Sequence, residues 1–352
     1  MKQKKVLITG GNGFLGQHLV HYFLEQGRVV PVVFDMLRIP MDVGKRYISV
    51  QGDIRSKKDV SRIFENFGPF DAVYHLASAM PDRSMSYTAT WDISVSGTIH
   101  IARAAHEHNV RSLVFTSSNV IYGIPASLPV TESTPLRPIE VYGRSKVQAE
   151  RELAKFQGTM NIQIIRCPVI TGVGRLGLQA ILFEFISENR NVYVLGDGSN
   201  RYQFVDATDV CQALAKASES QGFDIYNIGG DGVKTMKELY EIVIKFANSS
   251  SRIVSLPQGP ALFTLSLLDT LSISPLGIYQ YSMLGRSMYA DTTKIKTKLG
   301  WNPQKTIPGS FLENYTWYLA HKNDFDEVGR GTASSNRSVP KKRIFSLLKA
   351  LS

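Results

Sequence analysis

The sequence predicts an α/β fold built on a parallel, doubly wound sheet, and three observations lead to this prediction. Short apolar runs alternate with stretches of helical periodicity through the first half of the chain. These runs are apolar throughout, which is typical of parallel strands that are covered by helices on both faces. A glycine-rich turn joins the first apolar run to the first helical stretch. Alternation of this kind favours a parallel sheet.

The individual elements follow from their local patterns. Apolar runs predict strands at residues 4–9, 29–34, 47–51, 72–77, 112–117 and 162–167. Helical periodicity predicts helices at residues 14–27, 57–67, 95–109 and 145–156. After about residue 168 the pattern changes to a glycine-rich turn, further helices and short strands. In that half, Thr235 and Glu238 predict a capping box at the start of a helix.

This change of pattern predicts two units that share the chain. We expect a main sheet domain over residues 1–168, with segments near 201–228 returning to it. Residues 169–200 and 229–320 are expected to form a smaller, partly interleaved α/β lobe. Residues 321–352 are expected to form a basic, flexible tail, because this stretch is rich in Gly, Ser and Asn.

Composition narrows the class of protein. The chain has 352 residues, of which 43% are hydrophobic and 20% are charged, as in ordinary globular proteins. The sequence contains no uninterrupted run of about 18 apolar residues, so no transmembrane helix is predicted. The two cysteines, Cys167 and Cys211, offer neither a disulfide framework nor a metal site, which favours a reducing, cytoplasmic location. Six basic residues within 329–352 account for much of the net charge of +10, so the charge of the remaining chain is nearly balanced. This balance argues against nucleic-acid binding.

The glycine-rich turn predicts a dinucleotide site. Gly10, Gly13 and Gly16 directly follow the first strand and open the first helix. Glycines allow a tight turn and a close approach to a diphosphate, while the start of the helix offers amide donors and a favourable dipole. The strand–turn–helix context makes this motif more specific than three glycines alone.

Acidic residues after the second and third strands extend this site. Asp35 lies 19 residues after Gly16, where a carboxylate can bind the adenosine ribose and repel a 2′-phosphate. This favours NAD over NADP, although Arg38 lies close by and would favour NADP. Asp53 follows the third strand, and it is either a contact of the adenine amino group or an ordinary turn residue.

Tyr142 and Lys146 lie four positions apart at the start of a predicted helix, on the same face. They are either solvated neighbours or a chemical pair. In the second interpretation the lysine cation favours phenolate, lowers the pKa of the phenol and makes it a general acid or base.

Together with these features, further motifs resemble the extended short-chain dehydrogenases/reductases, the NAD-dependent epimerase/dehydratase group. The resemblance runs over about residues 4–318 and is carried by TGGNGFLG, GDI, HLAS, TSSNVIYG, YGRSK, LGDGS, DATDV and LGWNP. It implies a Rossmann-type NAD-binding domain, a substrate-binding smaller lobe and a homodimer. It also implies that Tyr142 and Lys146 are catalytic and contact the cofactor.

The resemblance further implies roles for individual residues. Ser118 matches the serine that binds the reacting substrate oxygen, with Ser117 as the competing choice. Tyr142 exchanges a proton with a secondary alcohol or ketone, Lys146 tunes it, and a hydride moves to or from NAD. The implied cofactor contacts are Gly10, Gly13, Phe14, Leu15, Gly16, Asp35, Asp53, Ile54, Leu76, Ala77, Ser78, Ser117, Tyr142, Lys146 and Pro168.

The substrate is less well specified, because this chain departs from the nucleotide-sugar members of the group. Ser94 stands where they often have Asn, Val169 stands at a diphosphate-binding Asn, and Tyr202 stands at an Arg, with Arg201 one place earlier. The implied substrate contacts are Ser118, Val169, Arg201 and Tyr202. A nucleotide-sugar substrate therefore has two alternatives: an apolar alcohol or ketone, or a non-catalytic NAD-binding scaffold.

Two apolar segments bear on the alternatives. Residues 261–273 are rich in Leu and Phe and form either a core helix or an apolar lid. In the tail, Ile344, Leu347, Leu348 and Leu351 would form one apolar stripe on a helix flanked by basic residues. Such a segment can lie on an anionic membrane surface. The tail is therefore expected either to contact the membrane peripherally or to stay in solution.

Overall fold

The structure is a computed structural model that describes residues 4–37, 46–79, 85–175, 177–270 and 278–322. The predicted tail, apart from its first two residues, and Arg38 lie outside the described residues.

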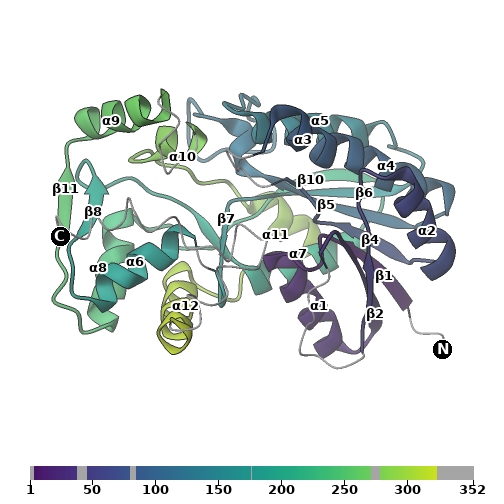
Figure 1. Ribbon diagram of the computed structural model, residues 1–352, viewed down its shortest axis with the longest axis horizontal. Coiled ribbons are helices and arrows are strands. Elements are labelled where there is room, and N and C mark those ends of the chain that lie inside the picture. Colours follow the sequence, from purple (N-terminus) through teal and green to yellow (C-terminus); the bar gives the residue numbers. More distant parts are fainter. Residues whose placement is uncertain (1–3, 38–45, 80–84, 176, 271–277, 323–352) are drawn as a thin grey trace.

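The centre of the fold is a seven-stranded parallel sheet with the strand order β10-β6-β5-β4-β1-β2-β3 (Figure 1). Its strands are β1 (Lys4–Thr9), β2 (Val29–Asp35), β3 (Ile48–Gln51), β4 (Ala72–His75), β5 (Ser112–Ser118), β6 (Asn161–Cys167) and β10 (Phe223–Asn227). The order reverses between β1 and β4, which is the point where doubly wound sheets bind their ligands. The predicted Rossmann-type α/β class is confirmed.

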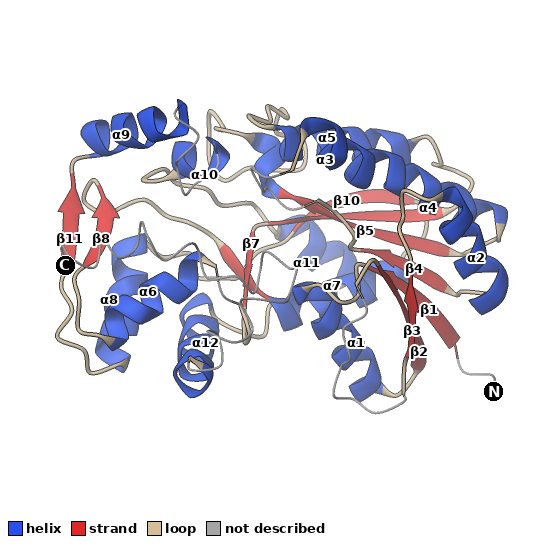
Figure 2. Ribbon diagram, in the orientation of Figure 1, coloured by secondary structure: helices blue, strands red, loops and turns tan. Residues whose placement is uncertain are grey.

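Helices cover both faces of this sheet (Figure 2). One face carries α1 (Phe14–Gln26), α7 (Ala207–Ser218) and α11 (Thr293–Leu299). The other carries α2 (Lys57–Phe67), α4 (Gly97–Glu107) and α5 (Val141–Ala154). Short helical segments, α3 (Tyr87–Trp91) and the π-helical turn η1 (Asp92–Ser96), lead into α4. Each fully buried Leu, Ile or Phe in these layers contributes about 1.5–3 kcal/mol, so the sheet forms a rigid platform.

A second group of elements packs beside the carboxyl edge of the main sheet. It contains α6 (Leu178–Ser187), α8 (Met236–Phe246), α12 (Ile307–His321) and a parallel pair, β8 (Val192–Leu195) with β11 (Ile253–Leu256). Its core includes Phe183, which meets the rings of Phe311 and Tyr315 edge-on. The predicted capping box of Thr235 and Glu238 is confirmed at the start of α8. The domain boundaries given above stay predictions.

Three further pieces connect the two groups. β7 (Val169–Thr171) pairs with β9 (Phe204–Asp206), and α10 (Ile278–Met283) packs near the loop after β5. The predicted apolar segment falls largely in α9 (Gln258–Thr270), where the Phe263 side chain is 72% exposed; residues 271–273 lie outside the described residues. None of the described helices has the length and apolar character needed to span a bilayer.

Candidate dinucleotide and active site

The turn between β1 and α1 is closed tightly, as the glycine motif predicts. Gly10 has a φ of +69°, and a Cβ there would lie 2.7 Å from the Ala77 backbone nitrogen. At Gly16 a Cβ would lie 2.4 Å from the Gly10 carbonyl oxygen. Both positions therefore require glycine, because any side chain would push α1 or the loop after β4 away from the turn.

Gly13 and the start of α1 leave an open face instead. A Cβ on Gly13 would meet only the Gly10 carbonyl oxygen within 4 Å, at 3.2 Å. No side chain caps α1, although α2, α5 and α7 are capped by Ser56, Glu140 and Asp206. The first-turn amides, which include those of Phe14 and Leu15, have no intrahelical acceptor. Space, amide donors and the helix dipole together fit a diphosphate.

Asp35 lies at the carboxyl end of β2, facing this turn. Its carboxylate accepts hydrogen bonds from the backbone nitrogens of Asn12 at 3.0 Å and Leu37 at 3.1 Å. Burial raises the pKa of Asp35, and these two hydrogen bonds oppose that rise. Beside it, Oδ1 of Asn12 is buried and has no partner among the described residues. An orphaned acceptor next to a half-buried carboxylate fits the hydroxyl donors of a ribose.

The loop after β3 holds the next predicted contacts. Asp53 forms an ion pair with Arg55 at 2.6 Å, and hydrogen bonds from Arg55 lower the pKa of Asp53 against an opposing effect of desolvation. Ile54 is buried, and its Cδ1 would lie 2.5 Å from a Cβ on Gly97. The structure thus gives Asp53 a partner of its own and gives the Ile54 side chain a packing role, while their contacts with adenine stay predictions.

The loop after β4 is held by a buried polar network that the sequence analysis did not predict. The Thr9 hydroxyl lies 2.6 Å from Nδ1 of His75, and Nε2 of His75 lies 2.9 Å from the Thr98 hydroxyl. The Ala77 nitrogen donates to the Thr9 hydroxyl at 3.3 Å, and the Ser78 hydroxyl lies 3.3 Å from that of Ser94. Leu76, Ala77 and Ser78 are thereby fixed beside the glycine turn.

Ser118, Tyr142 and Lys146 come together at the carboxyl ends of β5 and the start of α5. The Tyr142 phenol lies close to the Ser118 side chain, which lowers the pKa of that phenol. Lys146 is only 2% exposed, and its Nζ lies 5.8 Å from the centroid of the Tyr142 ring. The same Nζ donates to the Thr116 carbonyl oxygen at 2.8 Å and lies 4.5 Å from the Phe115 ring centroid. Lys146 is therefore buried beside the half-buried Tyr142 and Ser118, and the predicted pair is not a pair of fully solvated neighbours.

Two neighbours that the sequence analysis missed place Tyr142 beside Ser118. The Glu140 carboxylate caps α5 by accepting from the backbone nitrogens of Tyr142 at 2.8 Å and Gly143 at 2.9 Å. Gly143 lets the helix approach the 3₁₀ turn η2 (Asn119–Tyr122), because a Cβ there would lie 2.9 Å from Pro138 Cβ and 3.3 Å from the Val120 oxygen. Because the usual N-cap residues are Ser, Thr, Asp and Asn, Glu140 gave no ordinary capping signal in the sequence.

The pKa values correct one expectation. Lys146 was expected to lower the pKa of Tyr142, but burial raises it, with Cys167 and Glu140 adding to the rise. The Ser118 side chain and the charge of Arg175 oppose it less strongly. Burial also lowers the pKa of Lys146 to about 8, so the lysine is still largely protonated at neutral pH. Desolvation therefore outweighs the charge pairing in the protein without ligands.

Ser117, the competing choice for the catalytic serine, has a different set of partners. It is 4% exposed, and its hydroxyl donates to the Glu150 carboxylate at 2.5 Å. Glu150 in turn pairs with Arg166 at 2.7 Å inside the protein. The Ser117 hydroxyl thus belongs to a buried ion-pair network, whereas Ser118 contacts Tyr142.

The predicted substrate contacts lie at the end of β5, at the start of β7 and in the segment before β9. Pro168 is buried and, with Asn119, lines a small internal cavity. Val169 follows it and is 37% exposed. Burial raises the pKa of Tyr202, and the neighbouring Tyr279 and Asn119 side chains oppose that rise. Arg201 is exposed, and its backbone nitrogen donates a hydrogen bond to the Ser287 hydroxyl.

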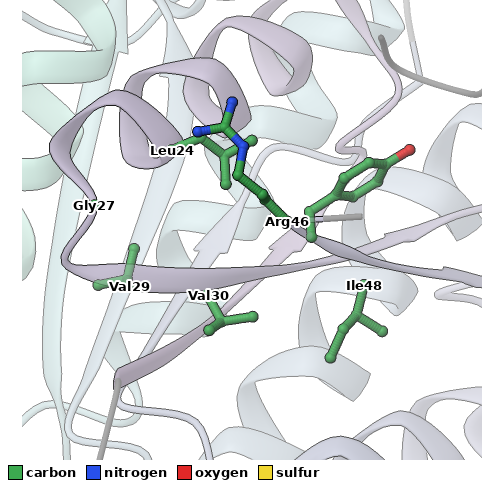
Figure 3. Close-up of a pocket in the computed structure, with 7 residues that line it drawn as sticks. Leu24, Gly27, Val29, Val30, Arg46 and Ile48 are labelled. Atoms are coloured by element: carbon green, nitrogen blue, oxygen red, sulfur yellow. The ribbon is translucent and has the colours of Figure 1, made fainter. Parts of the chain in front are cut away.

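Other parts of the described chain do not add to this site. A hollow near the start of β2 and β3 is lined by Leu24, Gly27, Val29, Val30, Arg46, Tyr47 and Ile48 (Figure 3). It lies at the amino ends of these strands, opposite the carboxyl edge where such sheets bind ligands. Within the described ranges, no group of three or more His, Cys, Asp or Glu side chains is placed to hold a metal ion.

Comparison with known proteins places the chain in a family. The profile of the "NAD dependent epimerase/dehydratase family" matches residues 6–229. An uncharacterized protein, y4nG, of Sinorhizobium fredii is 34% identical over 98% of this chain and 85% of its own length. The UDP-glucose 4-epimerase of Lactobacillus helveticus is 28% identical over 92% of this chain and 99% of its own. The crystal structure of the Bordetella bronchiseptica enzyme WbmG in complex with NAD and UDP has a TM-score of 0.72 at 20% identity, covering 90% and 94% of the two chains. This chain belongs to the NAD-dependent epimerase/dehydratase family.

Proposed function

We propose that the protein is an NAD-dependent epimerase of a nucleotide sugar. The observation that carries the proposal is the contact between Tyr142 and Ser118, with Lys146 buried beside them at the carboxyl edge of the sheet. The family supports an epimerase or dehydratase. Similarity along 99% of a UDP-glucose 4-epimerase supports a nucleotide sugar as the substrate class.

The cofactor assignment rests on the fit of the glycine turn and Asp35. The uncapped start of α1, with the open face at Gly13, would hold the diphosphate. Asp35 and the orphaned Oδ1 of Asn12 would accept hydrogen bonds from the adenosine ribose hydroxyls. The carboxylate would repel a 2′-phosphate, so NAD is preferred over NADP. When bound, NAD supplies the hydride acceptor and donor for a secondary alcohol carbon.

The three clustered residues divide the proton chemistry between them. Tyr142 takes the proton of the substrate hydroxyl as its carbon is oxidised and returns it when the ketone is reduced. Ser118 donates a hydrogen bond to the same oxygen as charge develops there. Lys146, 5.8 Å from the phenol ring and charged at neutral pH, would stabilise the phenolate form and would orient the nicotinamide ribose.

The test is an assay of the purified protein with NAD against a panel of UDP-sugars. The products are separated by chromatography, and NADH absorbance is followed in parallel. Formation of the epimer without net NADH is the expected result, because an epimerase regenerates its cofactor within each turnover. Net NADH would make the protein a dehydrogenase, and NAD binding without any product over the full panel would make it a scaffold.

One alternative has support from specific side chains. Val169 is 37% exposed in the segment after Pro168, and Tyr202 places an aromatic ring on the substrate side. Phe263 of α9 is 72% exposed. These features favour a dehydrogenase or reductase of an apolar alcohol or ketone. Including sterol and long-chain ketones with NADH in the same assay separates this alternative, since their reduction consumes NADH stoichiometrically.

A further inference from the structure

The loop between β7 and α6 brings a guanidinium group to the glycine turn. Arg175 lies on this loop, and its guanidinium carbon stands 5.2 Å from the centroid of the Phe14 ring. Phe14 is the first residue of α1 and directly follows Gly13. The charge of Arg175 also acts on the Tyr142 phenol, whose pKa it lowers. The guanidinium therefore lies beside the proposed diphosphate site, and its charge also acts on the proposed catalytic tyrosine.

Contacts from α1 and from α12 hold this loop. His18 of α1 forms a hydrogen bond through Nε2 with the Val173 carbonyl oxygen at 3.1 Å. Asn314 of α12 donates to the Arg175 carbonyl oxygen at 2.9 Å. The Arg175 nitrogen closes a turn by donating to the Gly172 oxygen at 3.0 Å. Because α1 and α12 belong to different groups of elements, the position of Arg175 depends on both.

The positive charge of Arg175 lacks a counterion in the described part of the chain. Among the described residues no carboxylate forms an ion pair with it, and its guanidinium lies over the face of the Phe14 ring. Burial lowers the pKa of Arg175 to about 10, so the group stays charged at neutral pH. An aromatic face compensates only in part for the lost hydration of a cation. A charged, half-buried guanidinium without a carboxylate partner is suited to an oxyanion, which its planar fork can bind with two parallel hydrogen bonds.

We propose that Arg175 binds the diphosphate of the dinucleotide from the side opposite the α1 amides; this inference rests on the proposed binding of NAD. The uncapped α1 amides would contact one side of the diphosphate, and the guanidinium over Phe14 the other. The second group of elements thereby supplies a cofactor ligand of its own. The same oxyanion chemistry could instead come from the substrate, as a sugar carboxylate or a nucleotide diphosphate.

Calorimetric titration of wild type and Arg175→Gln with NAD, ADP-ribose and adenosine tests the proposal. ADP-ribose keeps the diphosphate without nicotinamide, and adenosine has no phosphate. A charge-assisted hydrogen bond contributes about 1.5–3 kcal/mol, so affinity for both NAD and ADP-ribose should fall about 10- to 100-fold. Adenosine affinity should not change. Arg111→Gln removes an equal charge from an exposed residue before β5 and should leave all three affinities unchanged.

The other outcomes overturn the proposal in distinct ways. A loss for NAD but not for ADP-ribose would place Arg175 on the nicotinamide half. Unchanged affinity for both, with a raised KM for the nucleotide sugar, would assign the guanidinium to the substrate. If Arg175→Gln unfolds on heating well below wild type, Arg175→Lys replaces it, and its affinity for ADP-ribose should lie between the two. Failure of the wild type to bind NAD would refute the proposed function itself.

Discussion

Lys146 should make the stability of the ligand-free protein rise with pH. Its ammonium is 2% exposed, with one hydrogen bond to the Thr116 oxygen and the Phe115 ring beneath it. Burial lowers the pKa from 10.5 to about 8, against smaller opposing effects of Cys167 and Glu150. Lys146→Met keeps an unbranched apolar side chain against Phe115 but removes the titrating group.

The sign and size of the effect follow from proton linkage. Between pH 8 and 10.5 the unfolded chain holds the lysine proton and the folded chain has lost it, so the folded state gains stability as pH rises. The contribution is complete above 10.5 and is lost as pH falls through about 8. The gap between the two pKa values corresponds to about 3 kcal/mol. Wild type should gain that much relative to Lys146→Met.

Urea unfolding of cofactor-free protein at a series of pH values between 7 and about 10.5 measures this difference. Other groups, including Tyr142, titrate in both proteins and largely cancel in the comparison. Lys155→Met is the matched control, because the Lys155 side chain is 67% exposed and should show no pH-dependent difference. Parallel stability curves for wild type and Lys146→Met would mean that the ammonium is hydrated, and the reasoning from burial would fail.

Three further predictions concern the proposed site. Tyr142→Phe removes the phenolic proton, so turnover should fall by about 10²-fold or more while NAD binding, measured calorimetrically, is retained; near-normal turnover would exclude the general acid/base role. Wild type should bind NAD more tightly than NADP, and Asp35→Asn should narrow this preference by removing the carboxylate that repels a 2′-phosphate; tighter NADP binding by wild type would contradict it. Gly143→Ala adds a Cβ 2.9 Å from Pro138 Cβ and should lower kcat about 10-fold or more by shifting Tyr142, whereas Gly259→Ala, with no neighbour within 4 Å, should not; equal kcat values would remove Gly143 from this role.

The main sheet was predictable because buried parallel strands leave a local signature. The predicted strand at 4–9 coincides with β1, and the prediction at 162–167 differs from β6 by one residue. The prediction at 72–77 ran past the end of β4 at His75. Leu76 and Ala77 are apolar like the strand, but they leave the sheet to close against Gly10, and a residue's polarity does not record that change of partner.

The residues of the candidate site also divide into those that a local sequence pattern predicts and those that it does not. The spacing of the glycines and of Tyr142 with Lys146 is local, so the motif could be identified from the sequence. Arg175 contacts Phe14, far away in the chain, and Gly143 contacts Val120 of a preceding turn; no periodicity marks such contacts. The direction of the Tyr142 pKa shift was wrong for a related reason: the spacing gives the charge that faces the phenol, but not the burial that outweighs it.

The His75 network links the cofactor turn and the proposed catalytic lysine through one buried framework. Burial, together with the charge of Lys146, lowers the pKa of His75 to about 3, so the imidazole is neutral. The Thr98 hydroxyl donates its proton to the Ser94 backbone carbonyl oxygen at 2.7 Å. Toward His75 this hydroxyl can therefore only accept, from Nε2–H. Nδ1 must then accept from the Thr9 hydroxyl, which in turn accepts from the Ala77 nitrogen.

The hydrogen-bond direction is therefore fixed from the loop after β4 through β1 to α4. The His75 ring also stacks on Phe115, with centroids 5.6 Å apart, and Phe115 supports the Lys146 ammonium on its ring. A protonated His75 would break the acceptor role of Nδ1 and place a second cation near Lys146. Neutral His75, in a single tautomer, thus holds two features in fixed relative positions: the loop beside the glycine turn, and the Phe115 ring that supports Lys146.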